Sequence, residues 1–137
     1  MPSWTYEQLE VGTKANVAKT VTDDVIREFA RLSTDDNPVH LDEEYAKKTQ
    51  FGKRIAHGMF SASLISAVLG AHMPGYGTIY LSQSLKFKKP VFMGDTLTAW
   101  AEVAEKGEKK RVRIKTWVEN QHGEVVTEGE AMTMLTQ

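Results

Sequence analysis

Residues 58–72 read GMFSASLISAVLGAH, a helical segment whose apolar side chains spread around the whole helix rather than along one stripe. Its polar members before the closing His72 are three serines, and it contains no Asp, Glu, Lys or Arg. A helix that is apolar all round is usually buried on most of its sides. We therefore expect other elements to wrap this segment and to make it the centre of the core.

The chain that follows this helix is expected to form the sheet that wraps it. Four segments alternate apolar and polar residues, at 78–87, 96–105, 112–118 and 125–135. Such alternation, with a period of two and one apolar face, is typical of an antiparallel sheet that is covered on one side only. Turn residues such as Gly94-Asp95 and His122-Gly123 separate the strands.

The chain before the buried helix adds a strand and two helices. We expect a strand at 13–20, a helix that Thr22 caps and Asn37-Pro38 ends, and a short helix at 43–49 capped by Asp42. The predicted order is therefore one strand, helices, and then four strands in a meander. An antiparallel sheet wrapped around a long central apolar helix is an α+β arrangement, the hot-dog fold.

The composition indicates one soluble domain over residues 1–137. The chain is 41% hydrophobic and 26% charged, and its formal net charge of −1 lacks the basic excess of a general nucleic-acid binder. The absence of cysteine excludes disulfides, cysteine-based metal sites and a thiol nucleophile, and it suits a reducing cytoplasmic location. We expect neither a signal peptide nor membrane insertion, because the N-terminus carries acids and glycines interrupt the uncharged stretch 55–85.

Residues 33–40, STDDNPVH, are the first candidate for chemistry. Loops on a rigid scaffold are favoured places for reacting groups, and Pro38 restricts the backbone that presents Asp35 and His40. A carboxylate and an imidazole that both reach one water molecule form a general acid–base pair. The alternative is that the acids are turn residues and His40 is a solvated loop histidine, and the residue types alone leave both open.

The second candidate is the start of the buried helix, Ile55-Ala56-His57-Gly58-Met59. A helix N-terminus presents unpaired N–H groups and a positive dipole end, and a glycine there lets a substrate carbonyl approach closely. These features suit an oxyanion site that stabilises a thioester enolate. The alternative is that Gly58 only permits tight entry into the helix and that His57 is an ordinary residue near the cap.

Three segments resemble the MaoC-type (R)-specific enoyl-CoA hydratases, in their monofunctional single-domain form. They are 29–42 (FARLSTDDNPVHLD), which is similar to the hydratase motif of that family, then His57-Gly58-Met59, and then 84–95 (SLKFKKPVFMGD). The resemblance implies a hot-dog fold and a lyase that hydrates trans-2-enoyl-CoA reversibly to (R)-3-hydroxyacyl-CoA. It also implies a homodimer that needs no cofactor or metal, with coenzyme A entering as part of the substrate.

The resemblance implies roles for individual residues. Asp35 and His40 would be the catalytic pair that activates water, and Gly58 would offer its backbone N–H to the thioester carbonyl. The candidate substrate-binding residues are Asn37, which would also hold the loop, His57, Ser66, which would line the acyl pocket, and Gln83. From the strand pattern alone, Gln83 either lines the site or hydrogen-bonds internally.

The sequence leaves open which carrier holds the acyl group and which metabolic pathway the protein serves. Lys53, Arg54 and Lys88 are candidates for contact with the CoA phosphates, and the alternative is a solvated strand face. His40 and Asp42 are too few ligands for a zinc site. The same fold also serves dehydratases that act on (R)-3-hydroxyacyl groups of acyl carrier protein, thioesterases, and non-catalytic acyl-thioester-binding modules. The hydratase reaction fits fatty acid metabolism and the supply of polyhydroxyalkanoate precursors alike.

Overall fold

The computed structural model describes residues 3–137. The helices are α1 (Asp23–Ser33), α2 (Pro38–Leu41), α3 (Glu43–Lys47), α4 (Gly58–Ala71) and the short 3-10 helix η1 (Glu108–Lys110). The strands are β1 (Lys14–Thr20), β2 (Ile79–Gln83), β3 (Lys86–Phe87), β4 (Thr96–Lys106), β5 (Arg111–Glu119) and β6 (Val125–Met134). All six strands form one antiparallel sheet in the order β1-β4-β5-β6-β2, with β3 also paired to β6.

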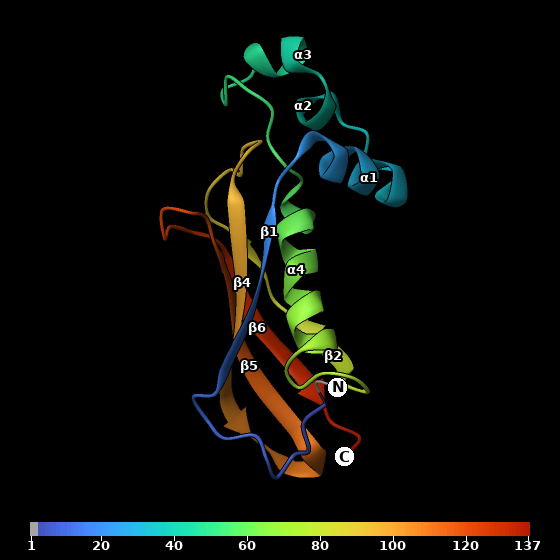
Figure 1. The fold of residues 1–137 in the computed structure, drawn as a ribbon, viewed down its shortest axis with the longest axis vertical. Helices are drawn as coiled ribbons and strands as arrows, with labels where there is room; N and C mark the ends of the chain where they lie inside the picture. The colour runs from blue at the N-terminus through green and yellow to red at the C-terminus, as the bar shows by residue number, and fades with distance from the viewer. Residues whose placement is uncertain (1–2) are drawn as a thin grey trace.

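Helix α4 runs along one face of this sheet, and α1, α2 and α3 gather beyond its N-terminal end (Figure 1). Its residues Ile65, Val68 and Leu69 are buried in one core cluster with inward-facing residues of β4 such as Leu97 and Ala99. The expected hot-dog fold, with a long apolar helix packed on a curved antiparallel sheet, is confirmed. The helix begins at the predicted residue, Gly58.

The expected helix caps at Thr22 and Asp42 are confirmed, but the end of the first helix differs. The side chains of Thr22 and Asp42 accept hydrogen bonds from backbone N–H groups in the first turns of α1 and α3. Helix α1 ends at Ser33 and not at Asn37, because Thr34 adopts a left-handed conformation with φ of 67°. A further helical turn, α2, occupies the segment that was expected to be a loop.

The expected four-strand meander is wrong, since only β4, β5 and β6 follow one another in the sheet. Strand β1 pairs with β4 along its whole length, from Lys14 opposite Glu102 to Thr20 opposite Thr96. Because β5 occupies the other side of β4, strand β2 pairs instead with the free edge of β6.

The expected single strand over 78–87 is broken into β2 and β3 between Gln83 and Lys86. The backbone of Ser84 crosses so close to Gly129 in β6 that a Cβ atom at position 129 would lie 1.8 Å from the Ser84 carbonyl oxygen. The apolar face expected for this segment is covered only in part, since Leu85 packs against the core cluster. Ile79 and Leu81 are 40% and 43% exposed, because β2 lies at the edge of the sheet.

Helix α4 is buried on most sides but not on all of them. Met59, Ser63 and Ser66 are exposed and recur at helical spacing, so they form an open stripe along the helix. Together with the apolar side chains of β2, this stripe leaves an uncovered surface on the single chain. Among the described residues, no helix combines the length and apolar character needed to cross a membrane.

Candidate active site

The segment from Ser33 to Leu41 is ordered by local hydrogen bonds. The Asn37 side chain accepts from the Val39 N–H at 3.1 Å and so caps α2, while Pro38 occupies the first helical position. His40 therefore lies on a four-residue helix and is only 8% exposed. This placement excludes the alternative of a solvated loop histidine.

Two buried imidazoles, those of His40 and His57, are stacked with their ring centroids 3.8 Å apart. The Nδ1 atom of His40 lies 2.8 Å from the Ile55 carbonyl oxygen, and the Nε2 atom of His57 lies 2.9 Å from the Asp35 carbonyl oxygen. Since a carbonyl oxygen only accepts, these nitrogens carry the protons. In the neutral rings, the free lone pairs are therefore on Nε2 of His40 and on Nδ1 of His57. The latter atom is buried without a hydrogen-bond partner in the described part of the chain.

The protonation of His40 is controlled mainly by burial. Burial lowers the pKa of His40, and the neighbouring His57 lowers this pKa further. The hydrogen bond to Ile55 and the charge of Asp35 act in the opposite direction but are outweighed. His40 is therefore neutral at physiological pH, with Nε2 able to accept a proton.

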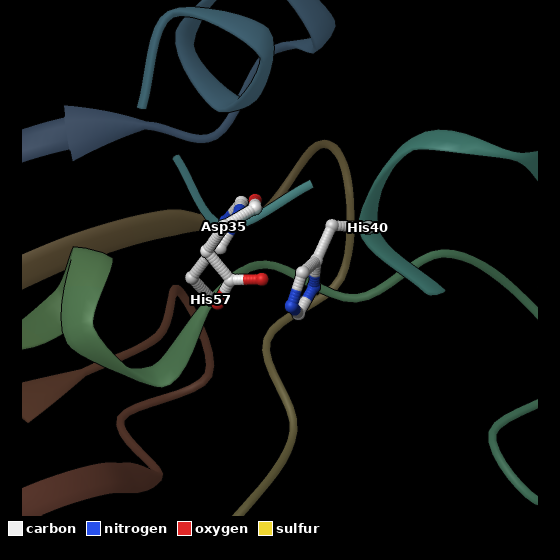
Figure 2. A group of neighbouring side chains, drawn as sticks. All are labelled: Asp35, His40 and His57. Atoms are coloured by element: carbon white, nitrogen blue, oxygen red, sulfur yellow. The ribbon is translucent and has the colours of Figure 1, made fainter. Parts of the chain in front are cut away.

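Asp35 completes a group of three titratable side chains at one end of α4 (Figure 2). One ligand-type atom each from Asp35, His40 and His57 lies within 4.8 Å of the other two. The Asn37 backbone N–H donates to the Asp35 carboxylate at 3.2 Å, so Asn37 holds this carboxylate through its backbone while its side chain caps α2. Asp35 and His40, the residues expected to act as a pair, therefore lie close together in the structure.

This group suits acid–base chemistry on water better than it suits a zinc ion. The ligand atoms of a tetrahedral zinc site, each about 2.0–2.1 Å from the metal, lie roughly 3.4 Å apart. To bind such an ion, the two imidazoles would have to turn so that one nitrogen of each points at the same position. His40 and His57 are instead stacked with only 27° between their planes.

A cavity of about 500 Å³ opens in front of these side chains. Asp35, His40, His57 and Gly58 all line it, and most of its remaining wall is apolar, as at Phe51. An apolar cavity with a few converging polar groups is the usual form of a small-molecule site. The cavity therefore brings the predicted catalytic residues together in one place.

Gly58 lies where α4 starts and faces this cavity. His57 occupies the N-cap position without a side-chain hydrogen bond to the helix, so the first amides of α4 are not capped by that residue. The Phe87 ring packs against Gly58 so closely that a Cβ atom at position 58 would lie 2.9 Å from its Cδ1 atom. Glycine at this position thus leaves room for a ring contact that the sequence did not reveal.

The other candidate substrate-binding residues, Ser66 and Gln83, line a second cavity of about 510 Å³ beside the open stripe of α4. Met59 lines both cavities. The Gln83 amide donates to Thr116 Oγ1 and to the Ser84 carbonyl, each at 2.9 Å. Gln83 therefore hydrogen-bonds internally and lines this second cavity, not the one that contains Asp35 and His40.

The three basic candidates for phosphate contact have different surroundings. Lys88 lines the catalytic cavity with its ammonium 3.5 Å from a Glu128 oxygen, and the Lys53 ammonium lies 4.3 Å from the centroid of the Phe92 ring. Arg54 does not fit the role, because its side chain is only 10% exposed and its guanidinium already contacts Asp23 and the His40 carbonyl.

Sequence reasoning missed two hydroxyl groups in the wall of the catalytic cavity. Ser61 donates to the Gly58 carbonyl at 2.7 Å, and its Oγ lies 2.7 Å from the Thr127 Oγ1. Both residues are buried. Ser61 could have been predicted from the sequence, because it lies one helical turn after Gly58. Thr127 could not, because it reaches the site only through the pairing of distant strands.

The chain is similar to proteins of known function over most of its length. The sequence profile of the family described as "MaoC like domain" matches residues 7–126. The chain is 50% identical over 131 residues to the (R)-specific enoyl-CoA hydratase of Rhodospirillum rubrum, an alignment that covers 95% of this chain and 90% of that protein.

Solved structures agree with this relationship. The unliganded R-hydratase PhaJ1 from Pseudomonas aeruginosa superposes with a TM-score of 0.90 at 50% identity, over 95% of this chain and 84% of that one. The (R)-hydratase from Aeromonas caviae involved in PHA biosynthesis superposes with a TM-score of 0.91 at 45% identity, over 94% and 98% of the two chains.

Proposed function

The chain belongs to the MaoC-like domain family, and from this premise we propose that it is an (R)-specific enoyl-CoA hydratase. It adds water to a trans-2-enoyl-CoA and yields an (R)-3-hydroxyacyl-CoA, and it also catalyses the reverse reaction. The observation that carries the proposal is the meeting of Asp35, His40 and the Gly58 end of α4 in one cavity. The high identity to (R)-specific hydratases over nearly the whole chain supports the same reaction.

The first step of the proposed mechanism polarises the thioester. The substrate carbonyl oxygen accepts a hydrogen bond from the Gly58 N–H, where the positive end of the α4 dipole favours developing negative charge. Electron density moves from the double bond toward this oxygen, which makes C3 electrophilic. One such donor typically contributes about 10²–10³-fold to the rate.

The second step adds water to the polarised double bond. The Asp35 carboxylate and the His40 Nε2 atom hold one water molecule, and one of them accepts its proton as the oxygen attacks C3. The π bond between C2 and C3 breaks, and C2 takes a proton from the same pair, so that both groups add to one face. Positioned acid–base catalysis contributes about 10²–10⁴-fold. No cofactor takes part, and coenzyme A arrives as part of the substrate.

His57 has a binding role in this scheme. Its Nε2–H holds the Asp35 backbone at 2.9 Å, which leaves the Nδ1 lone pair free to accept a hydrogen bond from water or substrate. Asn37 belongs to the same assembly through the Asp35 carboxylate. We assign the CoA phosphates to Lys88, which lines the catalytic cavity, and to Lys53.

The acyl chain is proposed to run from the catalytic cavity past Met59 into the second cavity, where Ser66 and Gln83 lie. Met59 lines both spaces, and in this proposal a movement of its side chain joins them. Ser66→Ala is expected to change the preference among acyl chain lengths more than the rate with a short substrate. An unchanged profile from four-carbon to eight-carbon enoyl-CoAs would remove Ser66 from the site.

We also propose that the protein acts as a homodimer. A second copy would cover the open stripe of α4 and the exposed apolar side chains of β2, where Ile79 and Leu81 stand uncovered at the sheet edge. Pairing of two β2 edges would join the sheets of both copies into one. Analytical ultracentrifugation is expected to give twice the mass of the chain, and a monomer at micromolar concentration would contradict the proposal.

The test of the function is the loss of enone absorbance with crotonyl-CoA, followed by chiral analysis of the product. We expect rapid formation of (R)-3-hydroxybutyryl-CoA. Activity only with acyl carrier protein thioesters would instead assign the chain to the dehydratases of this fold. No activity with either carrier would favour an acyl-thioester-binding module. The absence of cysteine is compatible with a cytoplasmic site of action, in fatty acid metabolism or in supplying polyhydroxyalkanoate precursors.

A further inference from the structure

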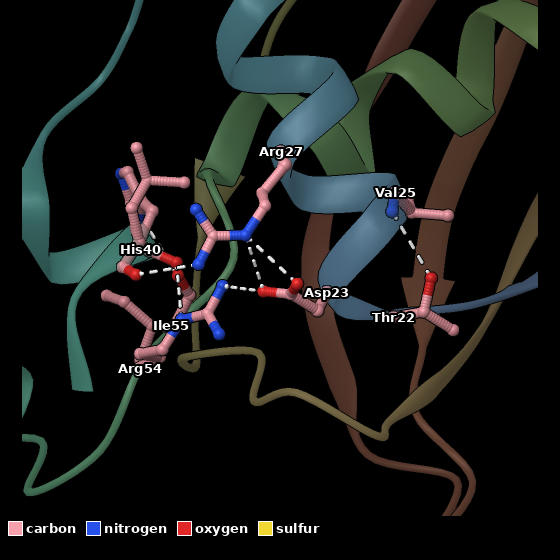
Figure 3. Close-up of polar contacts among 8 residues, drawn as sticks. Thr22, Asp23, Val25, Arg27, His40, Arg54 and Ile55 are labelled. Atoms are coloured by element: carbon pink, nitrogen blue, oxygen red, sulfur yellow. Dashed lines mark hydrogen bonds and ion pairs between the residues drawn. The ribbon is translucent and has the colours of Figure 1, made fainter.

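A cluster of charged side chains contacts the backbone at His40 and Leu41 (Figure 3). The Asp23 carboxylate at the start of α1 accepts from the Arg27 Nε at 2.9 Å, and it lies 2.8 Å from an Nη2 atom of Arg54. The side chain of Arg54 is nine-tenths buried, whereas those of Asp23 and Arg27 are half-exposed. We call these three residues the Asp23 cluster.

Two members of the Asp23 cluster donate hydrogen bonds to backbone carbonyls of α2. Arg54 donates from Nε to the His40 carbonyl at 2.8 Å, and Arg27 donates from Nη2 to the Leu41 carbonyl at 3.2 Å. The last carbonyls of any helix lack partners within that helix, and a helix of four residues does not hold its own conformation. Side chains from α1 and from the segment before α4 therefore supply the partners that α2 lacks.

The residue that follows Arg54 holds the same histidine by its ring. Ile55 accepts from His40 Nδ1 at 2.8 Å, and its own N–H donates to the Val39 carbonyl at 3.3 Å. Residues 54 and 55 thus contact both the backbone and the imidazole of His40. Displacing this segment would move the imidazole relative to Asp35.

We propose that Arg54, held by Asp23, is a positioning residue that fixes His40 for catalysis, rather than a ligand for the phosphates of the substrate. The inference rests on the proposed hydratase function, because it assigns Arg54 a role in that reaction through His40. Its basis is the simultaneous contact of one buried guanidinium with the Asp23 carboxylate and the His40 carbonyl.

The chemistry of arginine explains why this residue type stands here. The guanidinium is a planar fork whose Nε and Nη2 atoms can serve two acceptors in a fixed geometry. Lysine offers one compact ammonium, which cannot reach both acceptors in that geometry. We therefore expect Arg54→Lys to retain charge and folding but to restore only part of the rate that Arg54→Met loses.

The decisive experiment compares two substrates with the Arg54→Met variant, which keeps much of the aliphatic stem. The substrates are crotonyl-CoA and crotonyl-pantetheine, which lacks the nucleotide phosphates. A displaced reacting group commonly lowers the rate by up to about 10²-fold. We expect kcat to fall about 10–100-fold on both substrates, with KM within about twofold of the wild-type value. A rise in KM with crotonyl-CoA alone, at unchanged kcat, would overturn the proposal and assign Arg54 to phosphate binding.

Matched variants separate positioning from general loss of stability. Arg31→Met removes an exposed arginine of α1 that pairs only with Glu28 among the described residues, and it should leave both kinetic constants unchanged. Asp23→Asn should lower kcat in the same direction as Arg54→Met, since it removes the partner that orients the guanidinium. If Arg54→Met fails to fold, Asp23→Asn carries the test, and an unchanged kcat in that variant overturns the proposal.

A readout without turnover keeps the proposal separate from the proposed function. The imidazole nitrogens of ¹⁵N-histidine-labelled protein report the Nδ1–H of His40, and the sequence has four histidines to assign. We expect the His40 nitrogen shifts to move in Arg54→Met and to stay in place in Arg31→Met. Unchanged His40 shifts in Arg54→Met would refute the positioning role, whether or not the wild-type protein hydrates any thioester.

Discussion

His40 and His57 stack face to face with 3.8 Å between their ring centroids, although seventeen positions separate them in the chain. The contact joins helix α2 to the N-terminus of α4, and each ring donates to a backbone carbonyl. Two imidazoles in contact cannot both carry a positive charge without mutual repulsion. The stack therefore favours the neutral form of His40, which is the state that a general base requires.

The pH dependence of the reaction should reveal this stack. Burial, aided by His57, lowers the pKa of His40 below its ordinary value of 6.5. His40 must be neutral to share in accepting the proton, so the acidic limb of kcat/KM should have its midpoint below pH 6.5. A pH profile of kcat/KM with crotonyl-CoA measures this. An acidic limb at or above pH 6.5 would contradict the predicted direction.

The same shift predicts how folding stability depends on pH. The pKa of His40 is lower in the folded protein, so the unfolded chain binds the proton first as the pH falls. The contribution of His40 to stability is complete above pH 6.5 and is lost between 6.5 and its lower folded pKa. Urea unfolding at several pH values measures this. Within that window, the free energy of unfolding should change more steeply with pH in the wild type than in His40→Gln. His122→Gln, at an exposed turn, is the control and should follow the wild type.

Asp35→Asn tests the acid–base pair directly. The amide oxygen can still accept from the Asn37 N–H, so the fold of the loop should persist, but the amide cannot take a proton from water. We expect kcat for crotonyl-CoA hydration to fall at least about 10²-fold, with an unchanged melting temperature. Asp36→Asn changes the neighbouring acid, which lies outside the catalytic cavity, and should remain active. Retention of more than about a tenth of the activity by Asp35→Asn would refute its role.

The sequence was most informative where a local pattern determines the structure. The all-round apolar helix and the caps at Thr22 and Asp42 were predictable, because periodicity and capping act within a few residues. The stack of His40 on His57 was not predictable, since it depends on how α2 and α4 meet in space. The surroundings of Arg54 were not predictable for the same reason: its partner Asp23 lies 31 positions earlier, so the sequence showed only a basic residue near the site.

Gly129→Ala tests the reason for the break between β2 and β3. The new Cβ atom would lie 1.8 Å from the Ser84 carbonyl oxygen, which is backbone and cannot rotate away. We expect a loss of about 2–3 kcal/mol or more in the free energy of unfolding, measured by denaturant titration. Gly107→Ala is a matched control, because its Cβ would make only an ordinary contact at 3.6 Å with Arg111. Equal stability of the two variants would show that the crossing at Ser84 adjusts freely.

Gly58→Ala tests the start of α4, where glycine serves both packing and chemistry. The added Cβ would lie 2.9 Å from the Phe87 ring, which lines the catalytic cavity and is half-exposed. Because an exposed ring can move, we expect folding to survive, and alanine is the better helix former by up to about 1 kcal/mol. The displaced ring then occupies the space through which the thioester approaches the Gly58 N–H. A fall in kcat/KM of at least about 10-fold is expected, since a single oxyanion donor is worth about 10²–10³-fold.

A second variant shows which part of that loss comes from Phe87. In Gly58→Ala/Phe87→Ala the methyl group has room, so kcat/KM should return toward the value of Phe87→Ala alone. Residues in direct contact are expected to show such non-additive effects, and the double-mutant cycle measures their coupling. Full additivity of the two losses would mean that the methyl group itself blocks the carbonyl. In that case the close contact of Gly58 with Phe87 would be incidental to the oxyanion site.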